Sequence, residues 1–127
     1  MSAHQLFFHL TWSTIDRLPM IDSPTRDFLD QFFRRTAVRE HVEVVELAIL
    51  ASHVHVVIRT KPRIDLSRLV QMMKGGSSYA ASRVPGNKLG LRWTREYSAT
   101  TVSPRILPEA VRYLQAQNTR HPREIPS

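Results

Sequence analysis

Two pairs of residues, about sixty positions apart in the sequence, carry side chains that could act together on one substrate. His53 and His55 alternate within an apolar run, and a β-strand would point both imidazoles to the same face. Tyr113 and Gln117 stand one helical turn apart, so a helix would also place them on one face. If the two faces meet, two imidazoles and an amide oxygen could hold a divalent metal beside a phenol. Such a site could break a phosphodiester bond by attack of the tyrosine.

Neither pair is a specific signal by itself. Histidines at this spacing also occur in apolar cores, and a tyrosine with a glutamine four residues later is unremarkable on a helix. Two imidazole ligands suit manganese, zinc and similar ions, and an oxygen ligand shifts the preference towards Mg²⁺ or Mn²⁺. The His-Glu-x-x-His motif of zinc proteases is absent from the sequence. The interpretation therefore depends on the overall charge and on the elements that carry the two pairs.

The composition is that of one basic domain. The 127 residues carry a net charge of +7 and have a pI near 10.8, which favours a polyanionic partner such as nucleic acid. Solubility alone, or an anionic membrane surface, is the alternative explanation of this charge. The chain has no cysteine, which excludes disulfides and thiolate metal sites and favours a cytoplasmic location. No run approaches the roughly 20 apolar residues that a membrane helix needs, and we expect a single domain over residues 1–127.

The amino-terminal half of the sequence predicts a strand, a helix and a hairpin. Apolar and polar residues alternate over residues 4–14, which indicates a strand. Ser23-Pro24 is typical of an N-cap followed by proline at the first helical position, and it predicts a helix to about residue 40. Two β-branched runs, at residues 42–50 and 53–59, predict a hairpin with a tight turn between them.

The carboxy-terminal half predicts two more helices and a strand. Asp65 is the expected N-cap of a helix that Gly75-Gly76 either breaks or only weakens. The remaining expected segments are a loop at residues 84–90, a strand within residues 91–102, a helix from Pro104 or Pro108 to about Asn118, and a proline-broken tail at residues 121–127.

The order β-α-β-β-α-β, followed by one more helix, matches the ferredoxin-like split βαβ pattern. We therefore expect an α+β fold with an antiparallel sheet, two helices on one face, and the last helix on the other face or at an edge. Within residues 53–59, the valines and the isoleucine would pack on the two helices, and the histidines would face the last helix. The apolar stripe of that helix is expected from Leu107, Val111 and Leu114, with Ala110, Tyr113 and Gln117 beside it.

Four segments of the chain, in this order and spacing, also resemble a known family. They are an opening strand and turn at residues 6–21, Leu-Ala-Ser-His-Val-His-Val-Val-Ile at 50–58, Trp-Thr-Arg-Glu-Tyr-Ser-Ala-Thr-Thr-Val at 93–102, and Val-Arg-Tyr-Leu-Gln-Ala-Gln at 111–117. Together they resemble the single-tyrosine HUH transposases of small bacterial insertion sequences, which include the REP-associated tyrosine transposases. Ser52 stands where the family often has asparagine, and the lone His121 stands where it frequently has two histidines.

The resemblance implies an enzyme that cleaves and rejoins single-stranded DNA at hairpin-bearing ends. It implies that Tyr113 is the nucleophile, which would leave a 5′-phosphotyrosine and a free 3′-hydroxyl. It also implies that His53, His55 and Gln117 hold one Mg²⁺ or Mn²⁺. With one such tyrosine per chain, we expect a homodimer, or a monomer if the protein is of the REP-associated type.

Several residues are candidates for strand recognition. Trp93 and Tyr97 could stack on unpaired bases, although Trp93 fits core packing better. The charged candidates are Arg17, Arg59, Lys61, Arg63, Lys74, Arg92, Arg95, Arg105 and Arg112. Tyr79 is a competing nucleophile, but it has no ligand-type residue near it in the sequence. The alternative functions are a non-catalytic ferredoxin-like nucleic-acid binder, such as a domesticated relative, and a small HUH replication initiator or relaxase.

Overall fold

The computed structural model describes residues 5–81 and 90–120, and it describes the backbone alone for Tyr79 and residues 118–120. The elements are β1 (Leu6–Ser13), a short 3-10 helix η1 (Ile15–Arg17), α1 (Ser23–Arg39), β2 (Glu43–Ile49), β3 (His53–Thr60), α2 (Leu66–Ala81), β4 (Ser98–Val102) and α3 (Leu107–Arg120). The loop predicted at residues 84–90, apart from Gly90, lies outside the described residues, as does the tail with His121.

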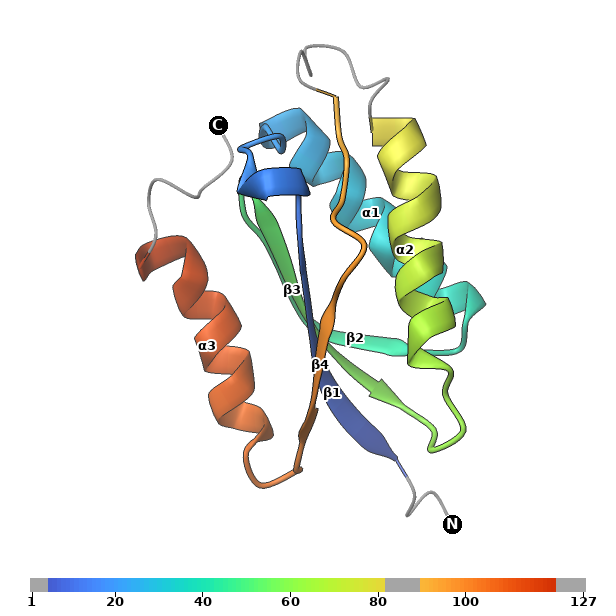
Figure 1. The fold of residues 1–127 in the computed structure, drawn as a ribbon. Helices are drawn as coiled ribbons and strands as arrows, with labels where there is room; N and C mark the ends of the chain where they lie inside the picture. Colours follow the sequence, from blue (N-terminus) through green and yellow to red (C-terminus); the bar gives the residue numbers. More distant parts are fainter. Residues whose placement is uncertain (1–4, 82–89, 121–127) are drawn as a thin grey trace.

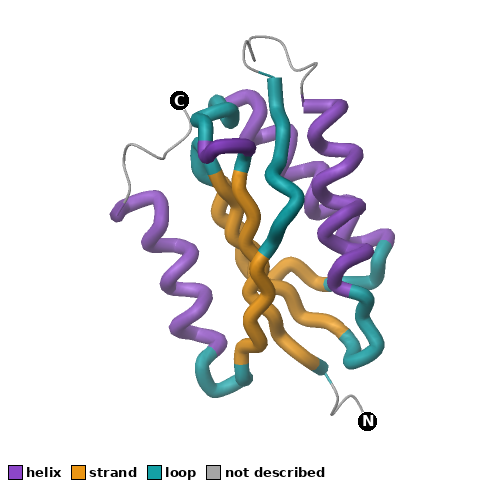
Figure 2. Tube along the Cα trace, viewed as in Figure 1, coloured by secondary structure: helices purple, strands orange, loops and turns teal. Residues whose placement is uncertain are grey.

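The four strands form one antiparallel sheet with the order β2-β3-β1-β4. Helices α1 and α2 cover one face of this sheet, and α3 lies on the other face (Figure 1). The same arrangement is visible in Figure 2, where the strands run between helices on either side. This is the predicted α+β fold, with the β-α-β-β-α-β order and the additional C-terminal helix.

The two faces of β3 behave as the alternation predicts. Val54, Val56 and Ile58 belong to the main core, which also includes residues of α1 and α2. Val57, on the opposite face, forms a second cluster with Ala48 and Leu114 that holds α3 on the sheet. The same alternation sends His53 and His55 to the face of α3. Packing of the apolar side chains thus decides where the imidazoles point.

The start of α1 differs from the prediction by one residue. The N-cap is Asp22, not Ser23, and its carboxylate accepts a hydrogen bond of 2.9 Å from the backbone N–H of Thr25. Asp22 has an extended backbone, and its negative charge also interacts favourably with the amino end of the helix dipole. Pro24 remains within the first turn, where its missing N–H costs nothing.

Gly75 and Gly76 lie within α2 and do not break it. A Cβ atom built on Gly76 would lie 2.8 Å from Cζ of Phe32, so this glycine allows α1 and α2 to approach closely. A Cβ atom on Gly75 would meet no atom within 4 Å.

We therefore expect Gly75→Ala to raise the free energy of unfolding by about 0.5–1 kcal/mol, because alanine favours the helix and meets no neighbour. Thermal unfolding followed by circular dichroism measures the effect. Gly76→Ala is the matched control, in which displacement of Phe32 should cancel the gain. Equal stabilisation by both changes would contradict the packing of Phe32 on Gly76.

Candidate active site

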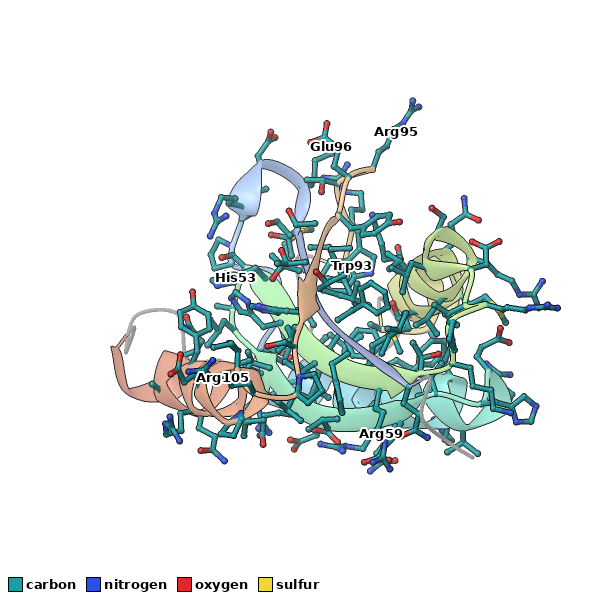
Figure 3. All side chains as sticks on the ribbon, turned by 90° about the horizontal axis from the view of Figure 1, so that it is seen from below. His53, Arg59, Trp93, Arg95, Glu96 and Arg105 are labelled. Atoms are coloured by element: carbon teal, nitrogen blue, oxygen red, sulfur yellow. The ribbon has the colours of Figure 1, made fainter. Side chains whose placement is uncertain are left out.

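Strand β3 places His53 and His55 on the face of the sheet that α3 covers. Both side chains are 8% exposed, and their ring centroids lie 5.0 Å apart. His53 pairs with Ser13 of β1, and His55 pairs with Thr11. In Figure 3, His53 lies on the side of the sheet where α3 runs. Two imidazoles are thus held side by side by a regular strand, which is more rigid than a loop.

Polar neighbours orient both imidazoles through their Nδ1 atoms. Nδ1 of His55 lies 2.8 Å from Oγ1 of Thr11 and 3.0 Å from Nε2 of His9. Nδ1 of His53 lies 3.1 Å from Oγ of Ser52 and 3.5 Å from the guanidinium of Arg17. Histidines that bind a metal through one ring nitrogen are commonly oriented by a hydrogen bond at the other. An Nδ1–H that donates to Thr11 in His55, or to Ser52 in His53, leaves Nε2 available to a metal. A hydrogen bond from Arg17 to Nδ1 of His53 would instead place the proton on Nε2, so the two arrangements of His53 exclude each other.

His9 is a third histidine of the site, and the sequence interpretation did not include it. Its ring centroid lies 5.2 Å from that of His55 and 5.9 Å from that of Tyr113. Burial lowers the pKa of His9 below its ordinary value, which favours the neutral ring. The alternation in β1 indicates that His9 and Thr11 share a face. Only the register, in which Thr11 lies opposite His55, shows that they belong to this site.

Helix α3 brings Tyr113 to the histidines. The ring of Tyr113 lies edge-on to His55, with centroids 5.8 Å apart, and the side chain is 44% exposed. Leu114, the next residue, is fully buried against Ala48 and Val57 and therefore fixes the helix on the sheet. The phenol is thus held beside the imidazoles while remaining accessible to a substrate.

The apolar stripe of α3 differs slightly from the prediction. Leu107 and Ala110 pack with Leu114 against the sheet, whereas Val111 is only half-buried and is not part of this cluster. The small side chain of Ala110 fits where the helix approaches the sheet.

Gln117 is buried on α3, one turn after Tyr113, with 2% of its surface exposed. Its amide nitrogen donates a hydrogen bond of 3.2 Å to the backbone carbonyl of Tyr113. Among the described residues, none donates a hydrogen bond to its Oε1. This hydrogen bond occupies the amide nitrogen, so the oxygen is the atom of this side chain that could act as a metal ligand.

The residues present fit a divalent metal only if Gln117 takes part. Within residues 5–81 and 90–120, no group of three or more His, Cys, Asp or Glu side chains could hold a metal ion. Two imidazoles and one amide oxygen form a donor set of mixed hardness, suited to Mn²⁺ and acceptable to Mg²⁺. Binding of either ion to this set is a prediction.

The other two tyrosines lie differently. Tyr97 packs against the main core, and its hydroxyl lies 2.9 Å from Oγ of Ser67 on α2. The side chain of Tyr79 lies outside what the structure describes. Tyr113 is therefore the tyrosine whose ring is seen against the histidines.

Two of the predicted strand-binding residues make internal contacts away from the histidines. The ammonium of Lys74, on α2, donates to the backbone carbonyls of Thr94 and Glu96. Burial lowers the pKa of Lys74, and the carboxylate of Glu96 opposes this shift. Trp93 packs against the main core, and its indole N–H donates to Oγ of Ser77.

Most of the remaining charged candidates have exposed side chains that could contact a DNA strand. Arg59 forms an ion pair with Glu43 at the far end of β3. The candidates with exposed side chains are Arg17, Lys61, Arg63, Arg92, Arg95, Arg105 and Arg112. Figure 3 shows Arg95 extending outward from the segment before β4 and Arg105 near the start of α3. None of the helices in the described part of the chain is long and apolar enough to cross a membrane.

Comparison with known proteins identifies the family. Residues 2–117 match the family described as "Transposase IS200 like". The structure of a candidate transposase from Deinococcus radiodurans R1 is similar, with a TM-score of 0.69, 24% identity, and coverage of 91% of this chain and 92% of that one. A REP-associated tyrosine transposase bound to a REP hairpin has a TM-score of 0.74 at 13% identity, with coverage of 91% and 68%. No curated protein matches significantly. Because the family match extends over most of the sequence, the chain belongs to the IS200-like transposases.

Proposed function

We propose that this transposase cleaves and rejoins single-stranded DNA at hairpin-bearing ends through a covalent 5′-phosphotyrosine intermediate. The observation that carries the proposal is the contact of the accessible Tyr113 ring with the buried His55, one helical turn from the buried amide of Gln117. The structural neighbour bound to a REP hairpin supports a hairpin substrate.

In the proposed reaction, the phenol oxygen of Tyr113 attacks the scissile phosphorus. The bond to the 3′-oxygen breaks, and that oxygen leaves as a free 3′-hydroxyl after taking up a proton. The phenol proton is lost to solvent, to which the half-exposed side chain is open. A phenol has a pKa near 10, so its attack at neutral pH needs assistance.

His53, His55 and Gln117 would hold the assisting metal, and Thr11 and His9 would orient His55. When bound, a divalent ion supplies Lewis-acid stabilisation of the charge that develops on the phosphate. Rejoining is the reverse reaction, in which a 3′-hydroxyl attacks the phosphotyrosine and restores the free phenol. Because the covalent bond is conserved, no external energy source is needed.

Cleavage of two DNA ends requires two nucleophilic tyrosines or two successive reactions of one. We propose a homodimer for coordinated cutting, with a monomer acting stepwise as the alternative. Sedimentation with and without hairpin DNA distinguishes the two states.

The direct test uses labelled single-stranded oligonucleotides that carry imperfect palindromes, which are first sought in the DNA flanking the reading frame. With Mn²⁺ or Mg²⁺ present, we expect a band on a denaturing gel that migrates as a protein–DNA adduct and disappears after protease treatment. Excess EDTA should abolish this band. An adduct of undiminished yield in EDTA would contradict the metal assignment, and hairpin binding without any adduct would favour a non-catalytic binder.

Binding of the strand should weaken steeply with salt, because the net charge of +7 implies contacts with phosphates that release counterions. The expected slope of log K against log salt is roughly −0.7 per phosphate contact on single-stranded DNA. Fluorescence anisotropy at several salt concentrations measures it. An affinity that does not change with salt would indicate a partner other than nucleic acid.

A further inference from the structure

Helix α3 covers only half of the face that carries the histidines. Its packed side chains contact β2 and β3, through Ala48 and Val57. On the other half, Thr11 of β1 lies opposite Ser98 of β4, and residues 98–101 are exposed. A DNA strand with a phosphate at Tyr113 must leave the site over a neighbouring surface. Apart from the Tyr113 ring against His9, no described side chain of α3 packs over β1 and β4, so this part of the face is the open route.

A pocket of about 480 Å³ lies on this route, between the end of β1 and the segment before β4. We call it the β1–β4 pocket; its lining includes Thr11, Ser13, Asp16, Arg17, Glu96 and Tyr97. Thr11 also contacts Nδ1 of His55, and the guanidinium of Arg17 lies 3.5 Å from Nδ1 of His53. The pocket therefore lies directly beside His53 and His55.

The turn that carries Arg17 into the pocket has an unfavourable backbone. Asp16 and Arg17 have φ angles of 53° and 52°, in the left-handed region that favours glycine. Hydrogen bonds hold the turn, including those from the Arg17 N–H to the Thr14 carbonyl and from the Thr14 hydroxyl to the Leu18 carbonyl. Strain of this kind is often retained at functional sites. At 3.5 Å, the guanidinium is at the limit of a hydrogen bond to His53 and could turn to another acceptor.

The chemistry of the pocket suits one nucleotide. A guanidinium binds a phosphate through two parallel hydrogen bonds. The carboxylates of Asp16 and Glu96 would repel a second phosphate, but they can accept hydrogen bonds from the amino group of adenine, cytosine or guanine. Thymine has no such amino group. The half-buried ring of Tyr97 offers an apolar surface to a base.

We propose that the β1–β4 pocket binds the nucleotide adjacent to the scissile phosphate and selects a base with an amino group. Arg17 binds the phosphate of that nucleotide, and Asp16 and Glu96 bind its base. This inference rests on the proposed cleavage of single-stranded DNA, so its test first establishes the adduct with the unmodified protein.

The experiment uses single-stranded oligonucleotides that carry the flanking palindromes with randomised nucleotides beside the stem. The covalently bound 3′ fragments and the released 5′ fragments are both recovered and sequenced, so that the cut ends mark the phosphate and both adjoining nucleotides are read. Thymine should be depleted at one adjoining position by at least about fivefold, the lower range of a base contact. The double variant Asp16→Gly, Glu96→Ala should lose this depletion, since glycine accepts the left-handed backbone at residue 16.

Arg17→Gly separates function from structure, because glycine relieves the strain at this position. We expect its melting temperature to be unchanged or higher and its rate of adduct formation to be at least about tenfold lower. Arg34→Gln, which removes an arginine paired with Asp30 on α1, is the control and should retain the rate.

Thymine at normal frequency, or depletion that persists in the double variant, would overturn base selection by this pocket. A normal rate in Arg17→Gly, or a rate that falls together with its stability, would overturn the role of Arg17. Absence of any adduct with the unmodified protein would overturn the proposed function and this inference together.

Discussion

Tyr113→Phe is expected to abolish the covalent protein–DNA adduct, with a fall in cleavage rate of more than about 1,000-fold. The change removes the attacking oxygen and retains the ring that lies against His55 and His9. Because the side chain is 44% exposed and the hydroxyl makes no hydrogen bond with the described residues, stability should change by less than about 0.5 kcal/mol. A denaturing gel with a labelled oligonucleotide and Mn²⁺ measures the adduct.

Tyr79→Phe and Tyr97→Phe are the matched controls, because each removes one tyrosine hydroxyl from the same chain. Both variants should still form the adduct. Tyr97→Phe should lose about 1 kcal/mol of stability, since its hydroxyl is within hydrogen-bond distance of Ser67. An adduct that survives in Tyr113→Phe and disappears in Tyr79→Phe would show that the nucleophile is Tyr79.

The arrangement of helices and strands follows from local patterns, which explains why it could be predicted. In β3, Val56 belongs to the main core, whereas Val57, one residue later, packs with Leu114 of α3. Because His53 and His55 lie on the same face as Val57, α3 covers the face that carries the histidines. Where two neighbouring residues could serve the same role, the sequence pattern did not decide between them. Asp22 and Ser23 are both good N-caps, and the extended backbone at Asp22 decides between them. Ala110 and Val111 are another pair of neighbours that could each face the sheet. Ala110 packs there and Val111 does not, because the rotation of α3 about its axis is set by its contacts with the sheet.

The approach of Tyr113 to the histidines could be predicted because each pair lies on one element with a fixed period, whereas the role of His53, His55 and Gln117 as metal ligands stays a prediction. The neighbours of the histidines could not be predicted. His9 and Thr11 reach His55 only through the register of β1 on β3, which no local pattern encodes. Arg17 was a candidate for strand recognition, but its contact with His53 was not predicted, because it depends on two consecutive left-handed residues, Asp16 and Arg17, that the sequence does not indicate. The contacts of His9, Thr11 and Arg17 with the histidines therefore come from tertiary structure, whereas the proposed chemistry of the site was inferred from the sequence.

His55→Ala is expected to separate DNA cleavage from DNA binding. Loss of one metal ligand should lower the rate of adduct formation more than about 100-fold. The dissociation constant for a labelled hairpin should change less than about threefold, because binding depends on phosphate contacts and stacking. The change also removes the partner of His9 and Thr11, at a cost of about 1–2 kcal/mol in stability.

Three measurements on His55→Ala decide the matter: adduct yield on a denaturing gel, hairpin affinity by fluorescence anisotropy, and Mn²⁺ affinity by titration calorimetry. His53→Ala should behave in the same way, since its imidazole lies 5.0 Å from that of His55. His41→Asn is the control, because it removes an exposed histidine outside the site and asparagine tolerates the left-handed backbone there. Weaker Mn²⁺ binding with intact hairpin binding supports the metal site. Normal Mn²⁺ affinity in both His53→Ala and His55→Ala would show that these imidazoles are not the ligands, even if cleavage is lost.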